Sequence, residues 1–343
     1  MKYFSKKWLN VKLLRCLAVA GIALLALWNT NSLVTGEIGT MFTPRHISDE
    51  YYRYRQFINA QNEYFRVLGI PVPSKWMVYT NRHPKVSMVD LTRGPWENFA
   101  IPHIDGHPER NERWLLSPLE QDFSDRLLDV SSIRYVVIPR DDPENADDFF
   151  GAYGERKVFL SHLDSLEYLK RIDPGTGDIV VYENTDVRPH LYLTQEPETI
   201  EKTIPFVPVD FSFVSPSQYT IQISSYPFDA VGQGENIDIN FSESYHPDWK
   251  LRKGEFSWWS SLWEDNYFLP DSYHRKNDAG LNSFSLPKEM VENGETFTLF
   301  FRPQAHLYMG LILSGLVFAI SIGYLLWKGI SYLVQRKKSN IKR

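Results

Sequence analysis

The 343-residue sequence predicts an α+β fold in which a mixed α/β subdomain precedes an antiparallel β-sandwich, with a transmembrane helix flanking this exterior region at each end. Three observations predict it: an uncharged apolar run near the C-terminus, a shorter one near the N-terminus, and two-residue periodicity after Pro205. We assign residues 1–36 to a basic cytoplasmic tail and a transmembrane or signal-anchor helix, 37–204 to the α/β subdomain, 205–305 to the β-sandwich, and 306–343 to a transmembrane helix and a basic cytoplasmic tail.

The first apolar run covers residues 16–28 and follows five basic residues. Its 13 uncharged positions span about 20 Å as a helix, which suits either the hydrophobic region of a signal peptide or part of a spanning helix. Extension to Gly36 gives a full span, and no good small-residue cleavage site follows Trp28. We therefore expect an uncleaved anchor with Trp28 at the outer interface.

The α/β subdomain is predicted to begin with a helix. Ser48 is a suitable N-cap, acidic residues occupy the first turn, and apolar residues at helical spacing continue as far as Leu68. Gly69 marks the end of this helix. Prolines are frequent over residues 71–118, which indicates loops with short strands.

Further helix and strand signals follow in the same subdomain. Residues 117–120 form a capping box with proline at the first helical position, and another helix is expected near Ser161. Short apolar strands are predicted over residues 134–139 and 179–182. The interleaving of the two signals predicts a mixed α/β arrangement.

Beyond Pro205, apolar residues alternate with polar ones. The alternation is clear over residues 219–223, 237–241 and 297–301. Half-buried antiparallel strands produce this pattern, and several such strands together predict a β-sandwich.

The last predicted element is a membrane-spanning helix. Residues 307–327 are 21 positions without a charge, and about 31 Å of helix is enough to cross a hydrocarbon core of about 30 Å. Six basic residues follow this run, and five basic residues precede the first apolar run. Every acidic residue lies between Glu37 and Glu295. Basic flanks stay cytoplasmic, so we expect a two-pass protein of the cell membrane with both termini cytoplasmic and the central domain extracytoplasmic.

The predicted exterior region is strongly acidic. It carries 26 basic against 42 acidic residues, a formal net charge of −16. This balance excludes nucleic acid as a partner, which requires a basic surface, and argues against docking on anionic lipid. The single cysteine, Cys16, lies in the first apolar run, so the exterior region is expected to contain no disulfide.

The sequence predicts no catalytic residue, no metal site and no cofactor. His103, Asp105 and His107 alternate, but a polar turn is favoured there over a cation site. The acidic residues within 141–148 lack the spacing of an EF-hand loop and are expected to form a solvated turn. No nucleophile elbow, phosphate-binding loop or dinucleotide fingerprint occurs.

The candidate binding site is the densest cluster of aromatic and acidic residues. Its members are Trp258, Trp259, Trp263, Glu264, Asp265 and Tyr267. Aromatic rings stack on sugar faces and carboxylates accept hydrogen bonds from hydroxyls, so glycan or partner binding is one interpretation. The alternative is that the rings fill the sandwich or contact the outer leaflet, where Trp and Tyr are common. If the segment is extended, adjacent Trp258 and Trp259 face opposite sides, and at least one is expected to be exposed.

Residues 241–250, with the sequence F-S-E-S-Y-H-P-D-W-K, resemble a segment of large bacterial membrane proteins of the YfhO type, which are relatives of the GT-C glycosyltransferases. Further similar stretches lie at residues 127–139, 181–184, 281–284 and 301–304. The resemblance implies a late sandwich strand and a glycan-related setting. GT-C enzymes carry many spanning helices and a catalytic acid in an early loop, whereas this chain resembles only the tail of such an enzyme. Within the motif, Glu243 offers an acid, while anchoring aromatics such as Trp249 favour a structural role.

These observations lead to three hypotheses about function. The leading one is a non-catalytic, membrane-anchored accessory protein that presents its exterior domain for handling a glycan or lipid-linked sugar, with a multispanning glycosyltransferase subunit as partner. The second is a glycan-modifying enzyme with paired carboxylates in the exterior domain. The third is an inert fragment of a larger GT-C enzyme. A pocket holding two acids at productive distance would favour the second hypothesis.

Overall fold

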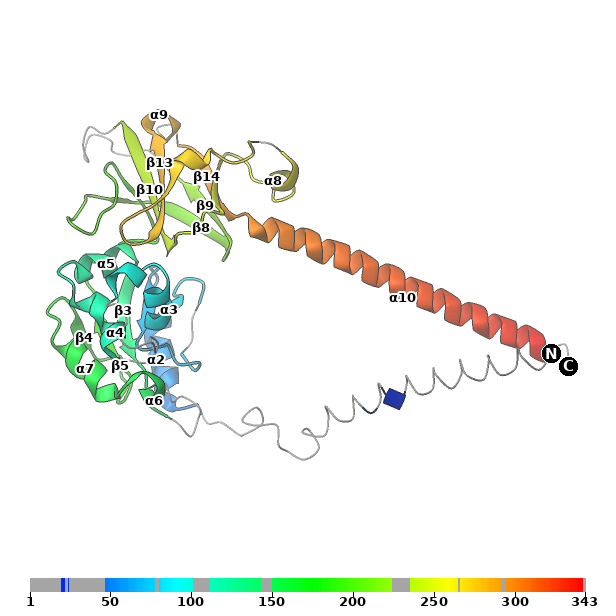
Figure 1. Ribbon diagram of the computed structural model, residues 1–343, viewed down its shortest axis with the longest axis horizontal. Coiled ribbons are helices and arrows are strands. Elements are labelled where there is room, and N and C mark those ends of the chain that lie inside the picture. The colour runs from blue at the N-terminus through cyan, green and yellow to red at the C-terminus, as the bar shows by residue number, and fades with distance from the viewer. Residues whose placement is uncertain are drawn as a thin grey trace. The chain divides into compact units, whose positions relative to one another are not determined.

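The computed structural model in Figure 1 describes residues 20–21, 24, 47–77, 80–100, 112–142, 150–223, 235–264, 266–291 and 294–341. Two compact units are present: Asp49–Asp141 with Phe149–Arg343 form one, and Met1–Ser48 with Asp142–Asp148 form the other. All the elements discussed below belong to the first. The predicted N-terminal helix lies outside the described residues apart from Ala20, Gly21 and Leu24, and it stays a prediction.

A five-stranded sheet in the order β2-β1-β3-β5-β4 begins this unit. Strands β2, β1 and β3 are parallel, whereas β5 pairs antiparallel with both β3 and β4. Most residues of β1 and β3 are buried, as expected for parallel strands. The strands span β1 Arg66–Gly69, β2 Lys85–Ser87, β3 Ile133–Ile138, β4 Lys170–Ile172 and β5 Val180–Glu183. Strands β3 and β5 are those predicted over residues 134–139 and 179–182.

Short helices pack with this sheet. They are α2 Asp49–Asn59, α3 Met88–Arg93, α4 Glu112–Leu116, α5 Ser124–Val130, α6 Phe150–Tyr153 and α7 Arg156–Asp164, with 3₁₀ turns at Glu97–Phe99 and Ser117–Glu120. All of them except α2 contribute to one hydrophobic cluster, while Phe57 of α2 packs on Tyr135 of β3 at 5.2 Å. Trp96 and Phe159 of α7 are both fully buried in this cluster. The first part of the unit is therefore mixed α/β, as the alternating signals predict.

Helix boundaries differ from the sequence prediction in three places. The helix predicted to run to Leu68 ends at Asn59, and Leu68 instead lies in β1, hydrogen-bonded between β2 and β3. Its spacing from Ile58 fits a helix, but burial between two parallel neighbours favours a strand. The capping-box residues form a 3₁₀ turn that ends before α5, and the helix expected near Ser161 begins at Arg156.

Two antiparallel sheets form the second part of the unit. One has the strand order β12-β13-β10-β6-β7 and the other β11-β14-β9-β8. Their strands are β6 Leu191–Thr194, β7 Val207–Pro208, β8 Asp210–Ser215, β9 Gln218–Gln222, β10 Asn236–Ser244, β11 Trp249–Lys253, β12 His274–Lys276, β13 Leu281–Pro287 and β14 Thr296–Phe301. Because β6 pairs with β10, this sheet includes residues before 205; the predicted domain boundary stays a prediction.

Both antiparallel sheets contribute to one hydrophobic cluster. Ile239 and Phe241 of β10 enter it from one sheet, and Trp249 of β11 with Phe297 and Leu299 of β14 enter it from the other. The two-residue alternation read from the sequence therefore marks the face of β9, β10 and β14 that enters this cluster. Burial itself alternates along β9, whereas β10 and β14 are buried on both faces over most of their length. Burial of this kind stabilises by about 25 cal/mol per Å² of apolar surface removed from water.

A buried polar cluster joins the first sheet to the second part of the unit. Arg66 of β1 donates a hydrogen bond from Nη1 to the Ser242 carbonyl oxygen, and its Nη2 lies 3.7 Å from a Glu243 carboxylate oxygen. His190 Nδ1 lies 2.6 Å from Ser242 Oγ, and the Tyr64 ring stacks on the imidazole at 4.0 Å. Burial, with the nearby Arg66 charge, lowers the pKa of His190 well below its ordinary value, so the ring is neutral.

The C-terminal helix α10 runs from Pro303 to Ile341. Its segment Pro303–Ser331 is long and apolar enough to cross a membrane, and among the described residues it is the one helix that meets this test. Large apolar side chains point outward along it, for example Phe318 at 67 % exposure. A continuous exposed apolar surface of this length suits hydrocarbon rather than water.

Candidate functional site

The candidate site lies on the outer face of β11 and β14. Within β11, Trp249 and Leu251 face the core, so Lys250 and Arg252 face outward. The chain then turns at Gly254, whose positive φ of 82° is a conformation that glycine adopts without a Cβ clash. From there it folds back over the sheet, and the Phe256 ring packs on Phe300 at 4.7 Å.

Tyr267 fixes this returning segment in place. Its side chain is buried, and its hydroxyl accepts a hydrogen bond from the Ser257 backbone N–H. The guanidinium of Arg252 lies 4.6 Å from the centre of the Tyr267 ring, and Arg252 Nη1 donates to the Tyr267 carbonyl oxygen at 2.8 Å. Tyr267, predicted as a binding residue, therefore has a clear structural role.

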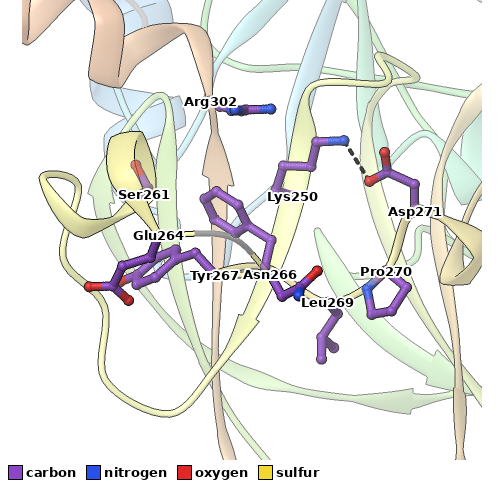
Figure 2. Close-up of a pocket in the computed structure, with 10 residues that line it drawn as sticks. Lys250, Ser261, Glu264, Asn266, Tyr267, Leu269, Pro270, Asp271 and Arg302 are labelled. Carbon is purple, nitrogen blue, oxygen red and sulfur yellow. Dashed lines mark hydrogen bonds and ion pairs between the residues drawn. The ribbon is translucent and has the colours of Figure 1, made fainter.

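A pocket of about 320 Å³ opens between the outer face of the sheet and this segment (Figure 2). Its lining is mostly polar and consists of Lys250, Ser261, Glu264, Asn266, Tyr267, Phe268, Leu269, Pro270, Asp271 and Arg302. Lys250, itself largely buried, donates a hydrogen bond from Nζ to Asp271 Oδ1 at 2.6 Å. Figure 2 shows Glu264 on the opposite side of the pocket from this ion pair.

Arg302 supplies the second cation of the pocket. Its backbone N–H donates to the Asp248 carbonyl oxygen at 3.0 Å, which fixes the residue at the junction of β14 and α10. The side chain is exposed and, within the part of the chain that the structure describes, its guanidinium has no hydrogen-bond or ion-pair partner. A free guanidinium beside a paired lysine is suited to an anionic group such as a phosphate.

The three predicted tryptophans lie next to the pocket rather than in its lining. Trp258 packs edge-to-face on Tyr308 of α10 at 5.4 Å, Trp259 packs on Trp258 at 5.6 Å, and Trp263 lies 5.8 Å from Trp259. Trp259 is 50 % exposed, so the prediction that one of the adjacent pair is exposed is confirmed. The reason differs, because Trp259 has helical backbone angles at the start of α8, Ser260–Trp263.

Of the six predicted site residues, Glu264 and Tyr267 line the pocket, and Asp265 lies outside the described residues. Sequence reasoning missed Lys250 and Arg302. The signal for Lys250 was present, because the alternation around Trp249 places it on the outer face. Arg302 gave no such signal, since a single arginine before an apolar run is common at membrane boundaries.

The other sequence candidates have structural surroundings or fall outside the description. Trp249 is a core residue, and Glu243 faces buried Arg66. The His103–His107 stretch and residues 143–148 of the acidic turn are outside the described residues. Within the described ranges, no group of three His, Cys, Asp or Glu residues is placed to hold a metal ion.

The fold and site together define a mixed α+β protein with antiparallel sheets and one C-terminal helix apolar enough to enter a membrane. Comparisons of this chain with protein-family models, with curated proteins and with solved structures find no match.

Proposed function

We propose that this protein is a non-catalytic, membrane-anchored accessory protein whose exterior pocket binds the polar group of a lipid-linked sugar. The proposal includes a two-pass topology in the cell membrane with both termini cytoplasmic, and a β-sandwich built from the two antiparallel sheets. The observation that supports it is the position of the pocket at the base of α10, with Arg302 one residue before the helix begins.

If α10 spans the membrane as proposed, the depth of the pocket follows from the position of Arg302. The uncharged run begins at Leu307, five residues further along the helix, which is a rise of about 7.5 Å. The polar headgroup region is about 5–8 Å thick on each side of the hydrocarbon core. A ligand in the pocket therefore lies at headgroup level, where a membrane lipid presents its phosphate and any attached sugar.

The lining of the pocket has the chemistry for both parts of such a ligand. Arg302 offers a planar pair of donors for phosphate oxygens, and Lys250, which is paired with Asp271, lines the same pocket. Asn266 offers an amide and Glu264 a carboxylate to sugar hydroxyls, and Ser261, whose hydroxyl donates to the Trp258 carbonyl oxygen at 2.6 Å, offers an acceptor oxygen.

Binding is favoured over catalysis by the arrangement of the carboxylates. Asp271 already accepts a hydrogen bond from the Lys250 ammonium at 2.6 Å. Hydrolysis of a glycoside requires two carboxyl groups that flank one scissile bond, and one of the two carboxylates in this pocket is engaged by a lysine instead. A multispanning glycosyltransferase subunit as partner rests on the sequence resemblance alone. The Phe241 and Trp249 side chains of the resembling motif pack in the core, so the motif supports a shared fold more than a shared reaction.

The test is binding of a short-chain isoprenyl diphosphate that carries one N-acetylated hexose to the full chain in phosphatidylcholine nanodiscs. We expect Arg302→Gln to weaken binding by about tenfold or more, because a hydrogen bond to a charged group contributes about 1.5–3 kcal/mol. The matched control is Lys276→Gln, which removes an exposed cation from β12 and is expected to leave binding unchanged.

Two outcomes would contradict the proposal. One is equal binding by the wild type and Arg302→Gln. The other is equal weakening by Arg302→Gln and Lys276→Gln, which would indicate attraction to overall charge rather than to the pocket. Thermal unfolding of each variant, unchanged from wild type, establishes that the exterior domain is folded in the binding assay.

A further inference from the structure

The aromatic surface beside the pocket is continuous with the membrane helix. Trp258 contacts Tyr308, the second residue of the uncharged run, with ring centres 5.4 Å apart at an interplanar angle of 73°. Helix α8 contacts α10, and Figure 1 shows α8 beside the first turns of that helix. The ring of Trp258 therefore lies at the level where α10 becomes apolar.

Two further indoles continue this surface from Trp258. Trp259 and Trp263 pack on one another at 5.8 Å and are 50 % and 64 % exposed. Two large apolar rings of one short segment thus remain uncovered by the exterior domain, directly beside a helix whose own apolar side chains are uncovered. Isolated exposed apolar residues are ordinary, but a contiguous patch of this kind marks an interaction surface.

We propose that Trp259 and Trp263 form a membrane foot, a second contact of the exterior domain with the bilayer that lies in the headgroup region beside α10. The inference rests on the anchoring part of the proposed function, because it requires α10 to span a membrane. It does not require the pocket to bind any ligand.

The chemistry of the foot identifies the bilayer interface as its partner. Indole has a large apolar face and one N–H donor, which suits the boundary between hydrocarbon and water. Trp258 fixes the depth of the foot through its contact with Tyr308. Tyr308 lies five residues after Pro303, where α10 begins, which is a rise of about 7.5 Å along the helix. The neighbouring carboxylate of Glu264 is exposed and gives no attraction to anionic lipid, so the interface itself, rather than headgroup charge, is the expected source of affinity.

The ring geometry favours a membrane over a glycan. Trp258 and Trp259 meet edge-to-face at 86°, and Trp259 and Trp263 meet at 57°, so neighbouring rings do not form one flat platform for a sugar chain. A foot at this position has a consequence for the pocket. Glu264, which follows Trp263 directly, lines the pocket, so attachment of the foot holds the pocket facing the headgroups.

The test uses the full chain in phosphatidylcholine nanodiscs, with Cys16→Ser, which removes the only cysteine. In this background, Trp263→Cys is labelled with an environment-sensitive fluorophore, and quenching by lipids that carry a nitroxide near the headgroup is measured. We expect a blue-shifted emission and strong quenching. The matched control is Glu289→Cys on α9, Lys288–Val291, which precedes the opposite end of β14 from α10 and is expected to show water-like emission without quenching.

A third site separates failure of the foot from failure of the anchor. Leu316→Cys, in the uncharged run, should be quenched by lipids that carry the nitroxide deep in the acyl chain. If Leu316→Cys is quenched but Trp263→Cys behaves like Glu289→Cys, the foot is wrong and the anchor stands. If Trp263→Cys stays unquenched by lipid but its emission shifts on addition of a soluble oligosaccharide, the surface is a sugar platform and the proposal is overturned. If Leu316→Cys is unquenched, the anchor itself is wrong and the foot falls with it.

Discussion

Replacement of Trp249 by alanine should strongly destabilise the protein, because its indole joins the two antiparallel sheets. The side chain is 7 % exposed and packs on Phe241 at 4.9 Å and on Phe301 at 5.3 Å. An aromatic side chain buries about 150–250 Å². Loss of roughly 150–200 Å² at about 25 cal/mol per Å² corresponds to about 4–5 kcal/mol, and truncations of buried Trp or Phe cost about 3–5 kcal/mol. We therefore expect Trp249→Ala to lower the free energy of unfolding by about 4 kcal/mol.

The assay is thermal unfolding of the full chain in detergent, followed by circular dichroism. Unfolding entropy of about 2.1 cal/mol/K per residue, over roughly 250 residues outside α10, converts 3–5 kcal/mol into a Tm decrease of about 6–10 °C. Trp263→Ala is the matched control, since the same atoms are removed from a side chain that is 64 % exposed. Its Tm should change by less than about 1 °C. Equal shifts for the two variants, or a shift below about 2 °C for Trp249→Ala, would refute this reasoning.

Two further predictions concern pH and topology. Burial raises the pKa of Asp129 to about 7, although its carboxylate accepts a hydrogen bond from Asn184 Nδ2 at 2.8 Å. The folded state thus binds this proton more tightly than the unfolded state, and stability is lost as pH rises from about 4 through 7. Asp129→Asn should match the wild-type Tm near pH 4 and exceed it above pH 7. The free energy of unfolding should then be higher by at most about 4 kcal/mol, reduced by solvent screening, and a gain that is independent of pH would contradict the assignment. For topology, a cysteine at Lys338 in the Cys16→Ser background should resist an impermeant thiol reagent in intact cells, because the basic flanks stay cytoplasmic. A cysteine at Asp141 should react with the same reagent. Labelling at Lys338 would overturn the two-pass topology.

The motif that suggested a relationship to GT-C enzymes has a physical explanation within this fold. Phe241 and Trp249 contact each other in the core, and Glu243 faces Arg66 across to the first sheet. The segment thus leaves β10, bonds to the α/β part and returns to the core at β11. Residues with these roles are required by the packing, so the motif predicts how the two parts of the unit join rather than a reaction.

The sequence by itself determined the elements whose burial is local and periodic. Strands β9, β10 and β14 follow from two-residue alternation, since one face of each strand enters the core. Helix α10 follows from length and absence of charge, since a spanning helix satisfies its own backbone hydrogen bonds. The sequence also identified the aromatic segment around Trp259, because three tryptophans within six residues are visible without any structure.

Only the tertiary structure decided the features that depend on distant neighbours. Leu68 fits a helix by spacing, but two parallel strands place it in β1. The pocket could not be read from the sequence, because its two cations are 52 positions apart and meet only where β11 pairs with β14, with Lys250 opposite Phe300. The position of Trp258 beside α10 likewise depends on its contact with Tyr308. Local patterns record which face of an element is buried, whereas the pairing of elements across the chain decides which exposed side chains share a site.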